Sequence, residues 1–216
     1  DNTDAGTGAD GTIAPKKSAM GGCDERDIRL QLLLTPSDSL SFTLAAHARD
    51  YSGTATLFHR AGLIKGSNDV SATPRDQVAL DEAMNNPQAY KTYGESLRGS
   101  WNMGPVTLTS ISAIETTSGY SRGDTDGGAA ANFGGTGFGQ SQGQVRSLDQ
   151  LTQELRLASN GDGPFKWQIG GMYFDQRDIT EFYQRAYFLT TAAHNPNNWV
   201  RLHDVNTSWA AFGQVS

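Results

Sequence analysis

The serine at position 121 stands in the spacing of a nucleophile elbow. Residues 119–123 read G-Y-S-R-G, which matches G-x-S-x-G, and the β-branched run 106–119 before them favours a strand. The chemistry also needs a helix directly after the serine, and a base such as His194 or His203. The segment after Arg122-Gly123, DTDGGAAANFGGTGFG, is a poor helix former. We therefore predict a loop turn at Ser121, keep a serine hydrolase as the weakest of three functional hypotheses, and expect no enzyme activity.

Metal and cofactor motifs are incomplete. Residues 124–127, DTDG, resemble the start of a calcium loop, but the later Asp or Asn and the final Glu are missing. We predict exposed acidic residues in an outer loop, with a weak surface cation site as the alternative. The Gly-rich run from Gly134 fits no phosphate-loop or dinucleotide spacing. The histidines lack H-E-x-x-H spacing, and the single Cys23 allows neither a zinc Cys pair nor an internal disulfide. We expect no metal and no cofactor.

A third group of residues has side chains suited to binding a chelate or a sugar. Arginine and aromatic side chains offer charge-assisted hydrogen bonds and flat apolar surfaces, and several lie at the ends of predicted strands or in long connections. The alternative is that they are ordinary loop and interface residues. The candidate ligand-binding residues are Arg49, Tyr120, Arg122, Asp124 and Trp199.

Composition limits the class of protein that positions these residues. The 216 residues carry 17 basic and 23 acidic side chains, a net charge of -6, so no basic surface for nucleic acid is expected. The many glycines and aromatics, with few good helical windows, favour an all-β fold. No run approaches the ~20 apolar residues of a membrane helix. A membrane β-barrel is not excluded, because its strands need only alternate residues to be apolar.

The segment 148–176 has the clearest pattern. Leu151, Leu155 and Leu157 alternate with polar residues such as Glu154, and after the turn-forming run 160–164 the alternation resumes with apolar side chains at every second position. This pattern predicts two antiparallel strands with one apolar and one polar face.

The rest of the chain alternates between short turns and long connections. Further strands are predicted at 26–34, 40–49, 90–101, 106–119 and 206–214, and a short helix at 76–84. The predicted long connections are 51–89, 120–147 and from about 176–180 to 201. Residues 1–25 are rich in Gly and Asp and are predicted to be a flexible loop or tail.

Short and long connections in strict alternation are typical of membrane barrels. Trp101, Phe165 and Trp167 lie beside short turns, where an interfacial aromatic girdle is expected. An open sheet leaves unsatisfied backbone groups in lipid, so about seven strands must belong to a larger closed sheet. The residues predicted to line a polar lumen are Arg29, Gln31, His47, Arg49, Glu95, Thr152, Glu154 and Arg156.

Several segments resemble the barrel of TonB-dependent outer-membrane receptors. They are LTQELRLAS at 151–159, the Phe165-Lys-Trp step with IGGMYFD after it, LTSISAIETTSGYSRGDTDGG at 108–128, and NTSWAAFGQ at 206–214. The resemblance extends over residues 26–216. It implies an antiparallel up-and-down transmembrane β-barrel segment with long extracellular loops, located in the outer membrane of a Gram-negative cell.

The resemblance also implies a function and partners. Such receptors have a barrel of about twenty-two strands filled by a plug, and they import scarce solutes such as siderophore-bound iron, cobalamin or carbohydrates. The expected partners are outer-membrane lipid and lipopolysaccharide, a small solute, and the TonB energy-transducing complex acting through a plug that this chain lacks. The chain would then be about a third of a receptor.

A soluble all-β module for ligand or carbohydrate binding remains the main alternative. The two hypotheses differ in what covers the apolar strand faces. In a sandwich Leu155, Leu157, Trp167, Ile169 and Tyr173 pack against a second sheet, whereas in a barrel they face lipid.

Overall fold

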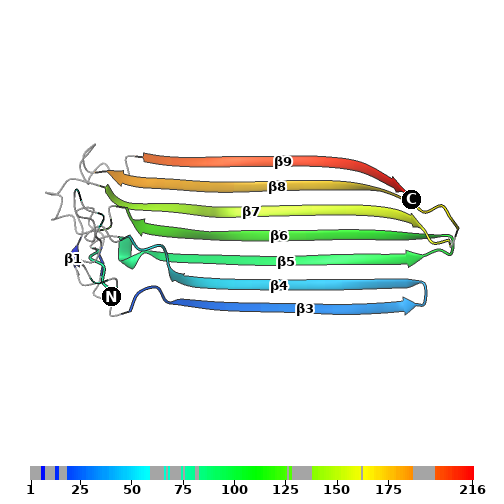
Figure 1. The fold of residues 1–216 in the computed structure, drawn as a ribbon, viewed down its shortest axis with the longest axis horizontal. Coiled ribbons are helices and arrows are strands. Elements are labelled where there is room, and N and C mark those ends of the chain that lie inside the picture. The colour runs from blue at the N-terminus through cyan, green and yellow to red at the C-terminus, as the bar shows by residue number, and fades with distance from the viewer. Residues whose placement is uncertain are drawn as a thin grey trace.

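One antiparallel sheet of seven strands dominates the computed structural model (Figure 1). The structure describes residues 19–58, 76–80, 83–125, 138–161, 163–186 and 198–216, with a few short pieces between and before them. Every strand pairs with its neighbours in sequence, in the order β3-β4-β5-β6-β7-β8-β9. The predicted all-β, up-and-down antiparallel fold is therefore confirmed.

The strands are long and similar in length. Two short strands, β1 (Gly6–Thr7) and β2 (Ile13–Ala14), pair with each other outside the main sheet. The main strands are β3 (Cys23–Ser37), β4 (Leu40–Thr54), β5 (Pro87–Asn102), β6 (Val106–Asp124), β7 (Phe138–Ser159), β8 (Trp167–Ala186) and β9 (Asn198–Val215).

Short and long connections lie at opposite ends of the sheet (Figure 1). Hydrogen bonds join two of the short turns. Asn102 Oδ1 accepts from the backbone N–H of Gly104 at 2.9 Å, and Asn160 Nδ2 donates to Asn102 Oδ1 and to the Gly104 carbonyl, both at 3.0 Å. Gly104 has φ of 89°, a conformation that favours glycine. The β5–β6 turn is thus fixed by its own asparagine and by that of the next hairpin.

The strand register assigns each side chain to one of two faces, because directly paired residues share a face. One row crosses the sheet as Leu32, Leu44, Leu97, Ser112, Gln153, Tyr173 and Trp209. We call this side the belt face, because the rows around this one form an apolar band. The other side carries Gln31, His47 and Glu154, and we call it the polar face.

No second layer covers the belt face over the described residues. Leu155, Ile169 and Tyr173 keep 49%, 53% and 41% of their surface exposed. Among the residues that the structure describes, the buried apolar ones all lie outside the sheet, in the connection between β4 and β5: Ala55, Val78, Leu80 and Ala83. A continuous exposed apolar surface of this kind is typical of a site that contacts a protein partner or a membrane. The arrangement differs from that of a sandwich.

Several predicted boundaries were wrong at the end with the long connections. The strand β6 continues to Asp124, β7 begins at Phe138, and β8 continues to Ala186, all within stretches predicted as loops. The helix predicted at 76–84 is also absent from the described part of that stretch. A short turn, η2 (Ala83–Asn85), stands there instead, and four residues from Ala83 to Asn86 have φ between 51° and 64°.

Glu95 was wrongly assigned to the polar face. It pairs with Ala46 and Ile114, so it shares the belt face with Leu97. Tyr93, two residues away on the same face, donates a hydrogen bond to its carboxylate. Glu95 marks the level at which the apolar band ends and polar residues begin. The other residues predicted to line the lumen do lie on the polar face.

Candidate solute-contact surfaces

The five predicted ligand-binding residues lie on two different faces. Arg49 lies on the polar face of β4, where it pairs with Asp27 and Thr92. Tyr120, Arg122 and Asp124 lie on the belt face of β6, beyond the apolar band. Trp199 shares a cross-strand row with Arg122, through Gln142 and Tyr183. The structure therefore places four of the five on one side of the sheet and Arg49 on the other.

Arg49 is held by two carboxylates. Its Nη2 lies 2.6 Å from Glu25 Oε1 and its Nε lies 3.8 Å from Asp27 Oδ1, both on the neighbouring strand β3. The guanidinium also lies 5.7 Å from the ring centroid of Tyr51. Half of the Arg49 side chain is exposed. The Arg49 cation is therefore held in place by Glu25 and Asp27, and the three side chains together carry one net negative charge.

Further along the polar face a row runs from Arg29 through His47, Gly94 and Glu115 to Gln150. His47 Nε2 lies 3.1 Å from Glu115 Oε1 although the two residues are on β4 and β6. The side chains meet because the strand between them has glycine at position 94; a Cβ there would overlap the Glu115 carboxylate. The glycine thus opens the space through which the pair forms.

Aromatic residues that the sequence reasoning did not single out lie on the same face near the long connections. Tyr90 lies over Gly119, since a Cβ at Gly119 would overlap it. Gln88 Nε2 donates to Tyr51 Oη at 2.7 Å. Tyr51, Tyr90 and Gln88 thus form a surface of flat rings and neutral hydrogen-bonding groups next to Arg49. Alternation, continued through the last residues of each strand, was the signal that could have identified them.

On the belt face, Tyr120 and Arg122 form one cluster. The Arg122 guanidinium lies 5.7 Å from the Tyr120 ring centroid, and its Nε donates to Gln142 Oε1 at 2.9 Å. Its Nη1 also reaches the Met84 sulfur at 3.4 Å, so the cluster contacts the connection between β4 and β5.

Asp124 was predicted to be exposed, and this prediction was wrong. It is fully buried, and its Oδ1 accepts from the backbone N–H of Gly127 at 2.9 Å. Its own N–H donates to Asn86 Oδ1 at 2.9 Å, while Asn86 Nδ2 donates to the Thr56 carbonyl at 3.0 Å. Asn86 is also fully buried. The two residues therefore fasten the first long connection to the end of β6.

Trp199 lies beside an ion cluster. The Arg201 guanidinium is 5.2 Å from the Trp199 ring centroid, and its Nη2 is 2.5 Å from Glu181 Oε1. Arg146 Nη1 approaches the same oxygen at 3.2 Å, from the position where the β7 register shifts. Burial raises the pKa of Glu181, but the hydrogen bonds and charges of Arg201 and Arg146 outweigh it and hold that pKa below its usual value.

The serine and the acidic loop show no catalytic or metal geometry in the described residues. Ser121 pairs with Gln88 and Gly143 in the extended strand β6, where a nucleophile elbow needs a sharp turn. His203 lies on the opposite face, and His194 and Asp126 fall outside the described residues. No group of three or more potential metal-ligating side chains occurs among the residues that the structure describes. In the part of the chain that the structure describes, no helix is long and apolar enough to span a membrane.

Comparison with known proteins gives one distant structural likeness. No family model matches the chain, and no curated protein matches it significantly. The fold is similar to that of the ferric yersiniabactin uptake receptor FyuA from Yersinia pestis, with a TM-score of 0.51 and 14% identity. The match covers 98% of this chain and 37% of that receptor. At this identity the likeness describes the all-β fold alone.

Proposed function

We propose that the chain forms part of the wall of an outer-membrane TonB-dependent receptor that imports a scarce solute and has no catalytic activity. The observation that carries the proposal is the exposed apolar band of the belt face, with a polar face behind it. Lipid on one side and a water-filled lumen on the other fit these two surfaces. The length and order of the connections, and the fold likeness to FyuA, also support it.

The strand dimensions fit this function. A tilted transmembrane strand needs about 9–11 residues, whereas the seven strands have 15 to 22. The extra residues project at the end with the long connections, where the belt face becomes polar. A barrel wall that extends beyond the bilayer in this way supports extracellular loops that receive the solute.

The solute would meet the polar face, which lines the lumen in this arrangement. Arg49 together with Tyr51, Gln88 and Tyr90 are the residues that we assign to its path. Siderophore-bound iron, cobalamin and carbohydrates are the solute classes considered, and an energy-transducing TonB complex acting through a plug is the proposed partner.

Cell fractionation tests the proposed membrane location, and growth assays test the proposed import of a solute. The protein is expected in the outer-membrane fraction, and a deletion strain is expected to grow poorly when one of iron, cobalamin or a single sugar is limiting. Restoring the gene with Arg49→Gln should reduce uptake of that solute at unchanged protein level, while Arg26→Gln on the belt face should leave uptake unchanged. A protein found only in the soluble fraction would refute the membrane location.

The soluble binding module is the second candidate. It requires a cover over Leu155, Ile169 and Tyr173, which are half exposed in the structure. A monodisperse, detergent-free monomer in light scattering would favour that alternative.

A further inference from the structure

A group of arginine side chains lies on the belt face at the end with the long connections, and we call it the cationic rim. It extends from β6 to β9 over two neighbouring cross-strand rows, Tyr120–Gln144–Glu181–Arg201 and Arg122–Gln142–Tyr183–Trp199, together with Arg146 from the register shift of β7. Tyr120, Arg122 and Trp199 belong to it. These three candidate ligand-binding residues therefore lie on the side that faces away from the proposed lumen.

Two arginines of the cationic rim share one carboxylate. Arg146 Nη1 and Arg201 Nη2 lie 3.2 Å and 2.5 Å from Glu181 Oε1. One carboxylate does not neutralise two guanidiniums, so the three side chains together carry one net positive charge. The Arg146 and Arg201 side chains are 50% and 39% exposed, whereas Glu181 is 12% exposed. A further anion would therefore meet the cations of this group and not its carboxylate.

Arg122 adds a second positive position on β6. Its guanidinium contacts three uncharged groups, the Gln142 amide oxygen at 2.9 Å, the Met84 sulfur at 3.4 Å and the Tyr120 ring at 5.7 Å. The next belt-face residue along the strand, Asp124, is fully buried. Even with Asp124 counted, the three arginines of the cationic rim outnumber its two carboxylates.

Asp149 and Asp175 lie nearer the apolar band and do not neutralise the cationic rim. Asp149 is the nearer of the two and pairs with Arg177, which is four residues from Glu181 along β8. Four residues of a strand span about 14 Å. This exceeds the Debye length of about 8 Å at physiological ionic strength, so the attraction between these carboxylates and the arginines of the rim is weak.

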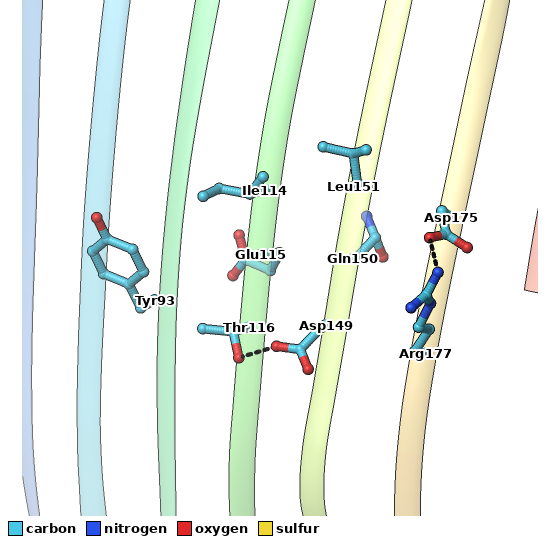
Figure 2. A pocket seen from close by; sticks show the side chains of 9 residues that line it. All are labelled: Tyr93, Ile114, Glu115, Thr116, Asp149, Gln150, Leu151, Asp175 and Arg177. Carbon is cyan, nitrogen blue, oxygen red and sulfur yellow. Dashed lines mark hydrogen bonds and ion pairs between the residues drawn. The ribbon is translucent and has the colours of Figure 1, made fainter. Parts of the chain in front are cut away.

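Between the cationic rim and the apolar band the belt face is hollowed (Figure 2). The hollow has a volume of about 600 Å³ and lies across β5 to β8. Ile114 and Leu151 lie at its apolar side. Thr116 and Asp149, joined by a hydrogen bond of 2.9 Å, lie at the side towards the rim and offer polar groups to a ligand. Along the strands the order is therefore apolar band, polar hollow and cationic rim.

We propose that the cationic rim binds phosphate groups of lipopolysaccharide, the glycolipid of the outer leaflet, and that the hollow next to it holds part of the sugar headgroup. In the proposed function the long connections lie outside the cell, so the rim lies at the level of the headgroups of that leaflet. Guanidinium groups bind phosphate oxygens through paired, charge-assisted hydrogen bonds, and sugar hydroxyls donate to a carboxylate such as Asp149. The acyl chains lie along the apolar band. The proposal rests on the membrane location under "Proposed function" and adds a binding site for one partner to it.

Native mass spectrometry of the protein in nonionic detergent tests this assignment. Deep-rough lipopolysaccharide, the same lipopolysaccharide after removal of its phosphates, and phosphatidylglycerol are added in equal amounts, with EDTA present to exclude bridging by divalent cations. The phosphorylated lipopolysaccharide is expected to bind about fivefold more than each of the others, which corresponds to about 1 kcal/mol. Equal binding of the phosphorylated and dephosphorylated forms, or binding of phosphatidylglycerol as strong as that of lipopolysaccharide, would overturn the proposal.

Two double variants locate the site. Arg122→Gln with Arg146→Gln removes two cations of the rim and leaves Glu181 its second arginine, so the fold is retained. This variant is expected to lower binding of the phosphorylated lipopolysaccharide about fivefold. Arg26→Gln with Lys91→Gln is the matched control, because it removes two exposed cations from the same face on β3 and β5, and it should retain the binding. Binding that is unchanged in the first variant, or reduced equally in both, contradicts the proposal.

The two proposals fail in different ways. A protein in the outer-membrane fraction without preference for phosphorylated lipopolysaccharide refutes the glycolipid site alone. A protein that does not fractionate with membranes refutes both.

Discussion

Gly94 shows how a single residue without a side chain supports an interaction between its neighbours. His47 and Glu115 lie on strands separated by β5, and their side chains meet over the Gly94 backbone. Glycine usually weakens a strand interior, and it often marks a close approach of other groups. Here the approaching group is the Glu115 carboxylate.

Gly94→Ala is therefore expected to destabilise the protein. The new methyl group displaces the Glu115 side chain and separates it from His47, at a cost of about 1–3 kcal/mol in the free energy of unfolding. Gly143→Ala is the matched control, since it also lies on the polar face and a Cβ there meets nothing within 4 Å. Urea denaturation in detergent measures both variants. A Gly94→Ala protein as stable as the Gly143→Ala protein would show that the space is not needed.

The ion cluster at Glu181 has a pH dependence with a defined sign. Because the pKa of Glu181 is lowered in the folded protein, its contribution to stability is complete above the ordinary Glu pKa of about 4.3 and is lost only as the pH falls through the lowered value. The stability difference between wild type and Glu181→Gln should thus be constant from pH 7 to about pH 5 and decrease below about pH 4. Denaturation across this range measures it, and a difference that already decreases between pH 7 and 6 would contradict the assignment.

At the scale of elements, the left-handed turn from Ala83 to Asn86 shapes the first long connection. Left-handed backbone is unfavourable for residues with a Cβ, and asparagine tolerates it better than most. The turn persists because Asn86 is buried and bonds to Thr56 and to Asp124. Asn86 therefore offsets the cost of the backbone conformation before it.

Asn86→Ala should release this connection. Loss of the two side-chain hydrogen bonds leaves the Thr56 carbonyl and the N–H of the buried Asp124 without that partner, which costs about 1–3 kcal/mol. Met84→Gly, in the same turn, keeps these bonds and relieves an unfavourable φ of 51°. Hydrogen exchange of residues 55–58 and 83–86 is expected to speed up in the first variant only. Equal exchange in both variants would show that Asn86 does not hold the turn.

Prediction from the sequence was less accurate at the strand ends near the long connections than in the rest of the sheet. Alternation identified the strands where one face is apolar, as at Leu151 to Leu157. It failed at residues 120–124, 138–147 and 180–186, because polar residues and glycine predominate on both faces there and the strands pair without a regular apolar period. The loop prediction at these residues was based on side-chain type, whereas the pairing depends on neighbouring strands.

The candidate site was less predictable than the fold. Residue type identified Arg49 and Arg122 as possible ligand contacts, but only the register shows that they lie on opposite faces. Asp124 was chosen for its charge, and its burial depends on a contact with Asn86, 38 positions away. Such contacts between distant segments leave no local pattern in a sequence.

At the scale of the whole molecule, the two faces should respond differently to charge. Leu155→Arg places a cation in the apolar band and is expected to cost about 2–4 kcal/mol at mid-membrane, which reduces the amount of folded protein in the outer membrane. Ser96→Arg introduces the same charge on the polar face between Ala45 and Ala113, where small neighbours leave space. It should be tolerated. Outer-membrane fractionation compares the two variants, and equal accumulation would contradict the assignment of faces.

The order of the strands also determines which strand pairs are affected when one pair is disrupted. Each strand pairs only with its neighbours in sequence, so the sheet is a linear array of hairpins without crossovers. In such an array, stability is approximately a sum over adjacent pairs, as in repeat proteins. Loss of the pairing between β5 and β6 would then divide the sheet into β3–β5 and β6–β9, and the strand pairs within each part would remain intact.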